Sequence, residues 1–172
     1  MKVQGNLDMK SNTEADYEAI VVGAGVAGIY QIKRLTDMGM KATVLEADPD
    51  LGGTWYNNRY PGARFDSESY TYGYSFSREV LDEWNWKEMF SAQPENLKYL
   101  NFVADKFDLR KYMQFNCRVQ SAIFDEETEL WKIQVSDGRD LTCRILVLAL
   151  GLLSQPTMPR IEGVEDFKGR SW

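Results

Sequence analysis

The sequence predicts an α/β fold in which a parallel sheet carries an inserted antiparallel β-meander. A short apolar run ends in a cluster of glycines and leads into an amphipathic helical pattern at residues 17–38. Two β-rich runs, at 121–124 and 131–135, flank a charged turn. The continuous apolar run at 145–151 then has the pattern of a central parallel strand that is buried on both faces.

The first strand is expected at residues 17–22, because this run becomes β-branched and apolar and is too short for a helix. It leads into Gly23, Gly25 and Gly28, which have the G-x-G-x-x-G spacing. Glycines at this spacing form a tight turn, let the backbone approach a pyrophosphate, and allow the next helix to pack against the sheet.

A helix is expected over residues 26–38, and the amides of Val26 and Ala27 at its start are candidates to hold phosphate oxygens. A second strand, 41–45, is closed by Glu46. This acid lies at roughly the 20-residue distance at which a carboxylate binds the hydroxyls of an adenosine ribose. The pattern predicts a Rossmann-like site for an adenine dinucleotide. The alternative is that the glycines only close a turn, which leaves the second glycine and the acid without a role.

The composition limits the chemistry of the chain. Its 172 residues are 44% hydrophobic, which is enough for one well-buried domain, and the net charge of −6 argues against a nucleic-acid surface. The sequence has no histidine, so the usual general base and metal ligand are absent. Cys117 and Cys143 lack metal-ligand spacing and are expected to be buried, and the acidic run at 125–129 is expected to be a solvated turn. Redox chemistry must therefore come from a cofactor.

Three segments are expected along the chain. Residues 1–15 are polar, lack the apolar core of a signal peptide, and are predicted to be a flexible leader. Residues 16–153 form the cofactor-binding domain, and 154–172 form a linker that leads away from it. No apolar run has the length of a membrane span, so we expect a cytoplasmic protein.

The segment at 54–66 is rich in aromatic residues and has no helical or strand period, so it is predicted to be a long ordered loop. Its rings could line a flat heterocycle, or they could simply cover the edge of the sheet. Asp66 could likewise be no more than the cap of a turn. Further on, the patterns indicate a helix at 77–90 that is broken around Asn85, a helix that begins at Gln93, and a third parallel strand at 114–119.

The motifs of the aromatic segment resemble those of the Baeyer–Villiger monooxygenases. The similar stretches are Gly52-Gly53-Thr54-Trp55-Tyr56, Asn58-Arg59-Tyr60-Pro61-Gly62-Ala63-Arg64, and Asp66. The resemblance extends over residues 17–172. Disulfide reductases of related fold are excluded, because no cysteine pair follows the two glycines. The N- and S-oxygenating flavin monooxygenases lack the Arg-Tyr-Pro-Gly run.

The resemblance implies noncovalent FAD, with the ligand at the edge of the sheet where strands end. The predicted cofactor-binding residues are Gly23, Gly25, Val26, Ala27, Gly28, Glu46, Gly53, Thr54, Trp55, Asp66, Tyr72, Val119 and Gly151. Tyr72 lies towards the flavin and Val119 towards the adenine in this interpretation. Asp66 is the predicted catalytic residue, paired with an arginine of a nicotinamide domain outside this chain.

The resemblance also implies an activity for a longer enzyme, which uses NADPH and O2 to insert one oxygen beside a ketone carbonyl. The product is an ester or a lactone. Residues 167–172 resemble the start of the family signature F-x-G-x-x-x-H-x-x-x-W-P, so most of the NADPH site is expected beyond this chain, which alone binds FAD without turnover. Two alternatives remain: a stand-alone flavin-binding or electron-transfer module, and part of an N- or S-oxygenating flavin monooxygenase. The sequence identifies neither the ketone nor the oligomeric state.

Overall fold

The computed structural model describes residues 14–155 and 157–170, so nearly all of the predicted leader lies outside the described residues. The helices are α1 (Val26–Asp37), α2 (Thr54–Asn57), α3 (Arg78–Glu83) and α4 (Gln93–Lys106). The strands are β1 (Tyr17–Val22), β2 (Ala42–Leu45), β3 (Met113–Gln114), β4 (Val119–Asp125), β5 (Leu130–Val135) and β6 (Asp140–Leu148). Short 3₁₀ turns occupy Ser69–Tyr72, Arg110–Tyr112 and Val164–Asp166.

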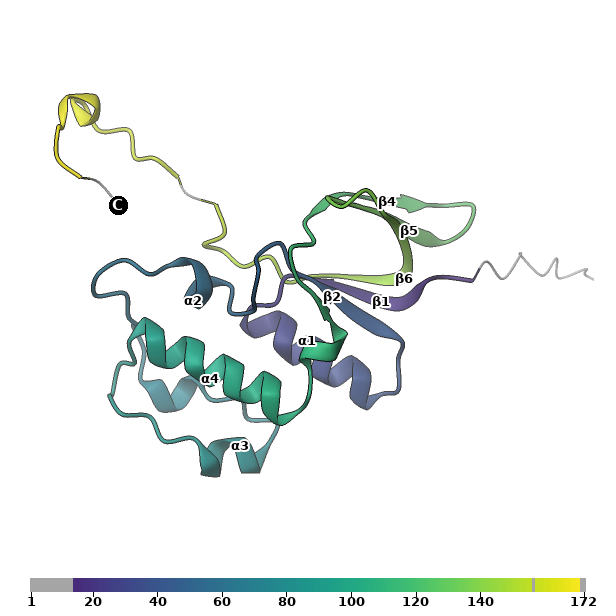
Figure 1. Cartoon of the computed structure of the whole chain (residues 1–172), viewed down its shortest axis with the longest axis horizontal. Helices are drawn as coiled ribbons and strands as arrows, with labels where there is room; N and C mark the ends of the chain where they lie inside the picture. Colours follow the sequence, from purple (N-terminus) through teal and green to yellow (C-terminus); the bar gives the residue numbers. More distant parts are fainter. Residues whose placement is uncertain (1–13, 156, 171–172) are drawn as a thin grey trace, which may run out of the picture.

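The six strands form one mixed sheet in the order β3-β2-β1-β6-β5-β4. Strands β3, β2, β1 and β6 run parallel, whereas β4, β5 and β6 pair antiparallel. The helices lie on one side of the parallel strands, and the meander of β4 and β5 rises on the other (Figure 1). The α/β prediction with an inserted meander is therefore confirmed.

Strand β1 is buried on both faces, as its apolar run predicts. Ala19 and Val21 pack with α1 and α4, while Ile20, between them, packs with the meander. Because side chains alternate across a strand, one short run supplies both cores. The helix α1 matches its predicted span to within one residue, and Gly39 follows its end with φ of 76°, which is the left-handed conformation that glycine adopts most easily.

The third parallel strand is much shorter than predicted. Only Met113 and Gln114 reach β2, and Val119 instead begins the antiparallel strand β4. Between them the chain turns at Asn116, whose φ is 55° and whose amide donates to the Asp48 carbonyl. This turn ends the parallel pairing and starts the meander.

Two helix predictions also need correction. The segment at 54–66 is not wholly a loop, because its first four residues form α2. The helix predicted at 77–90 ends at Glu83, since Trp84 is extended and the rings of Trp84 and Trp86 both pack on Tyr99 of α4. The contact of these two rings with Tyr99 therefore replaces the second half of the predicted helix.

The last apolar run is exposed in part, contrary to the prediction that both faces are buried. Ile145 is 45% and Leu148 is 65% exposed. The first half of β6 lies between β1 and β5, but its pairing with β5 ends at Cys143. Among the described residues, only β1 pairs with the positions that follow, so the other edge of this half faces no strand.

The predicted burial of both cysteines is confirmed: Cys117 and Cys143 are buried free thiols. Burial raises the pKa of the Cys143 thiol to about 11. Within residues 14–155 and 157–170 there is no cluster of three acidic or cysteine side chains arranged for a metal ion. None of the helices in this part of the chain is long and apolar enough to cross a bilayer.

We predict that Ile32→Ala lowers the free energy of unfolding by about 2–5 kcal/mol, because its side chain is fully buried between α1 and the sheet and truncation leaves a cavity. Urea denaturation followed by circular dichroism measures this change. Met38→Ala, at the exposed end of the same helix, is the control and should change stability by less than about 0.5 kcal/mol. Equal effects of the two substitutions would contradict this packing.

Candidate nucleotide-binding site

The turn between β1 and α1 contains glycine where no other residue fits. Gly23 has φ of 103°, and a Cβ atom there would lie 2.6 Å from the Ala149 carbonyl oxygen. A Cβ on Gly28 would lie 1.8 Å from the Gly23 carbonyl oxygen. These two glycines therefore permit the turn itself and the close packing of α1 against it.

A second glycine turn lies directly against the first. Gly53 has φ of 51°, and a Cβ added to it would lie 2.9 Å from the Gly25 Cα atom. Gly25 is the N-cap of α1, which has no side-chain cap and no acidic residue in its first turn. The two turns thus form a floor of bare backbone beside an uncapped helix N-terminus, an arrangement that suits an anion such as a pyrophosphate.

Glu46 is buried and held by backbone amides. One carboxylate oxygen accepts from the Ala24 amide at 2.6 Å, and the other accepts from the Asp48 amide at 2.9 Å. Its own carbonyl oxygen accepts from the Cys117 amide at 2.8 Å. These charge-assisted bonds fix a carboxylate at the end of β2, where the sequence predicts a ribose-binding acid.

These features meet in one cavity of about 600 Å³ at the ends of the parallel strands. The predicted site residues that line it are Gly23, Gly25, Val26, Ala27, Glu46, Gly53, Thr54, Val119 and Gly151. The lining includes residues that the sequence reasoning missed, among them Asn57, Cys117, Arg118, Leu148, Ser154 and Gln155. Ligands of open parallel sheets bind at this edge.

The remaining predicted site residues do not line this cavity. Gly28 lies beneath the turn, and Asp66 lies on the exposed segment after α2. Trp55 is buried, and its indole nitrogen donates to the Tyr72 hydroxyl, whose pKa is raised by burial although this hydrogen bond lowers it. The roles of Asp66, Trp55 and Tyr72 at a flavin stay predictions.

Helix α4 supports the floor from behind. The buried Gln93 side chain donates to the carbonyl of Trp55, and the Leu97 side chain packs against Gly52. Arg110 bridges Asp50 and Asp105, which joins the second glycine turn to the end of α4. The contacts of Gln93 with Trp55, of Leu97 with Gly52 and of Arg110 with Asp50 have no sequence motif, because they join residues that are far apart along the chain.

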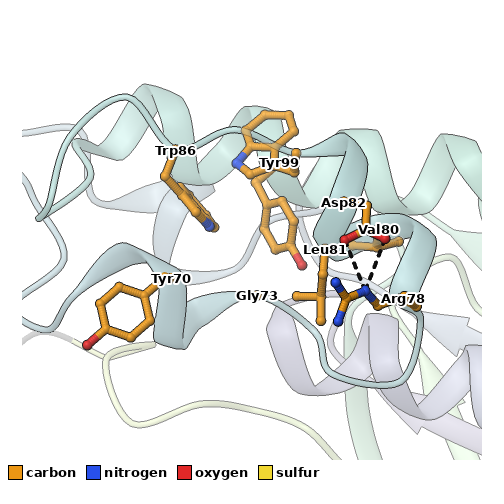
Figure 2. A pocket seen from close by; sticks show the side chains of 9 residues that line it. Tyr70, Gly73, Arg78, Val80, Leu81, Asp82, Trp86 and Tyr99 are labelled. Carbon is orange, nitrogen blue, oxygen red and sulfur yellow. Dashed lines mark hydrogen bonds and ion pairs between the residues drawn. The ribbon is translucent and has the colours of Figure 1, made fainter.

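A smaller cavity of about 290 Å³ lies between the 3₁₀ turn at 69–72, α3 and α4 (Figure 2). Tyr70, Trp86 and Tyr99 border it, and Arg78 closes one end with an ion pair to Asp82. None of the predicted site residues lines it. The larger cavity is therefore the candidate site.

Together, the glycine turn, the uncapped helix and the buried acid define a nucleotide-binding domain of the Rossmann-like class. The sequence matches the family of NAD(P)-binding Rossmann-like domains over residues 21–91. This match uses the sequence alone, and it assigns the chain to the same fold class as the structure does.

Three relatives of known activity show which Rossmann-like proteins this chain is similar to. Over about nine tenths of its length the chain is 48% identical to a 2-oxo-Δ3-4,5,5-trimethylcyclopentenylacetyl-CoA monooxygenase of Pseudomonas putida. It is 44% identical over 91% of its length to a Baeyer–Villiger monooxygenase of Pseudooceanicola batsensis. It is 41% identical over 94% of its length to the phenazine N-monooxygenase PhzNO1 of Lysobacter antibioticus.

The crystal structure of OTEMO complexed with FAD and NADP superimposes with a TM-score of 0.84, at 46% identity, over 92% of this chain. The chain spans about 30% of that protein, and 28–30% of the three relatives. It is homologous to the N-terminal part of the Baeyer–Villiger monooxygenases, which confirms the resemblance of its motifs.

Substitution by alanine should destabilise the fold more at Gly28, which lies within α1, than at Gly25, the N-cap of this helix. Gly28→Ala should lower the free energy of unfolding by about 1–3 kcal/mol or more, because its Cβ would overlap a backbone oxygen. Gly25→Ala should cost less than about 1 kcal/mol, since φ is −78° and the nearest atom is 3.5 Å away. Thermal and urea unfolding of both variants test this difference, and a larger loss for Gly25→Ala would contradict the turn described above.

Proposed function

We propose that this chain is the FAD-binding portion of an NADPH-dependent flavin monooxygenase that inserts one oxygen of O2 beside a ketone carbonyl. The cavity carries this proposal, because it places a bare backbone floor, a helix N-terminus and a buried carboxylate at one edge of the sheet. The relatives add support, since several are named monooxygenases and one similar structure is a complex with FAD and NADP.

The residues of the cavity fit an adenine dinucleotide. The floor formed by Gly25 and Gly53 admits a pyrophosphate close to the backbone, and the amides of Val26 and Ala27 lie at the positive end of α1. Glu46 offers acceptor oxygens to ribose hydroxyls. Bound FAD would supply the transfer of electrons from NADPH to O2, which amino-acid side chains alone do not carry out.

The surroundings of the cavity support a place for this chain within a larger enzyme. Leu148, Leu150 and Leu153 line the cavity and are more than half exposed, and residues 157–170 extend away from the sheet (Figure 1). In our proposal residues 16–153 form the FAD-binding domain and 154–172 lead to an NADPH-binding domain that covers this rim. The exposed carboxylate of Asp66 is then available to a cationic side chain of that domain.

The chain of 172 residues should bind FAD, and Glu46→Gln should weaken this binding about 10-fold. The substitution removes the charge that makes hydrogen bonds to ribose hydroxyls strong. Quenching of flavin fluorescence during titration of the apoprotein measures the affinity.

The control for this experiment is Glu83→Gln, which neutralises a carboxylate that pairs with Lys106 on the far side of the domain. It should leave the affinity for FAD unchanged. If the folded wild-type chain does not bind FAD, the FAD-binding proposal is wrong. If both variants bind as the wild type does, only the role of Glu46 is wrong.

A second candidate reaction is oxygenation of an aromatic nitrogen, because the chain is 41% identical to a phenazine N-monooxygenase. Expression of the gene beyond the codon of Trp172 distinguishes the two reactions. We expect a second glycine motif in the encoded sequence, NADPH consumption that depends on a ketone, and an ester or lactone as product. Phenazine oxides without ester formation would support the second candidate, and a stop codon directly after Trp172 would leave a stand-alone flavin-binding module.

A further inference from the structure

Arg118 is the one cationic residue among those that line the larger cavity, and Glu46 is the one anionic residue. In the described part of the chain, no ion pair or hydrogen bond engages the guanidinium of Arg118. Four other arginines pair with carboxylates, namely Arg64, Arg78, Arg110 and Arg139. Glu46 and Arg118 form no ion pair within the described residues, and each carboxylate oxygen of Glu46 accepts a hydrogen bond from a backbone amide.

The backbone at Arg118 is held on both sides. Its amide donates to the Ser136 hydroxyl at 3.1 Å, and its carbonyl accepts from the Ser136 amide at 2.8 Å. The preceding residue, Cys117, is buried and donates to the Glu46 carbonyl. The side chain of Arg118, in contrast, is exposed. An unpaired guanidinium therefore projects from a fixed point next to the buried acid.

The order of groups along the cavity assigns Arg118 to one end of a dinucleotide. The phosphates lie at the N-terminus of α1 and the ribose at Glu46 in the proposed mode of binding. Beyond Glu46 the wall is formed by Ala47 and by the segment Cys117-Arg118-Val119. The group that extends beyond the ribose, away from the phosphates, is the base.

We propose that Arg118 is a specificity-determining residue, whose planar guanidinium packs against the adenine ring of the bound dinucleotide. This inference rests on the proposed binding of FAD. A guanidinium is weakly hydrated and stacks well on aromatic faces, whereas the compact ammonium group of lysine does so less well. The contact favours FAD and ADP over ligands without adenine, such as FMN.

Binding of FAD, ADP, UDP and FMN to the 172-residue chain, measured by calorimetry and fluorescence titration, tests this inference. Arg118→Ala should weaken FAD and ADP alike, by about 5- to 30-fold, and should reduce the preference for ADP over UDP. Affinity for FMN should not change. Arg118→Lys should lose most of the same affinity despite its charge. Arg78→Ala, which removes an exposed arginine far from the cavity, is the matched control.

Three results would overturn the proposal. One is wild-type affinity for ADP in a folded Arg118→Ala variant, as judged by an unchanged melting temperature without ligand. Another is full, salt-sensitive affinity in Arg118→Lys, which would show attraction to phosphate. The third is a preference for ADP with an added 2′-phosphate that disappears in Arg118→Ala. If the wild-type chain binds neither FAD nor ADP, the proposed function fails and the inference with it.

Discussion

The Glu46 carboxylate connects the parts of the site to one another. Its bond to the Ala24 amide joins the end of β2 to the glycine turn after β1, and its second oxygen holds the chain at Asp48. The main chain of the same residue pairs with Gln114 and Cys117, where the third strand gives way to the meander. A buried carboxylate is stable only with such donors, so the end of β2, the glycine turn and the entry to the meander are fixed together.

Around this acid, backbone atoms form the surface of the site, and aromatic side chains pack in the layer beneath it. The close approach of Gly53 to Gly25 leaves no room for a Cβ atom on Gly53, whereas the Trp55 side chain bonds to Tyr72 and its carbonyl is held by Gln93. This division follows from the shape of the expected ligand. A pyrophosphate needs amides at short range, and such amides are useful only if a packed layer beneath them prevents movement.

The features that could be predicted from the sequence are those that depend on residues close together along the chain. The span of β1, the helix α1 to within one residue, and the position of Glu46 at the end of β2 follow from a short period and a fixed spacing, and the structure has all three. The end of the third strand depends on the turn at Asn116, and the end of α3 depends on the packing of Trp84 on Tyr99. No local pattern encodes these contacts. The place of Arg118 also depends on a distant contact, because the turn at Asn116 brings Cys117 onto the Glu46 carbonyl.

Strand β6 shows how the sheet, the cavity and the rest of a larger enzyme depend on one another. Its first half is covered by β1 and β5, and its second half ends in apolar side chains that form the rim of the cavity. Exposed apolar surface of this kind is costly in water, so whatever covers the rim stabilises the fold. A dinucleotide in the cavity and a following domain would both do so. Because a ligand that binds only the folded state raises its stability, occupancy of the cavity and order at the end of β6 should increase together.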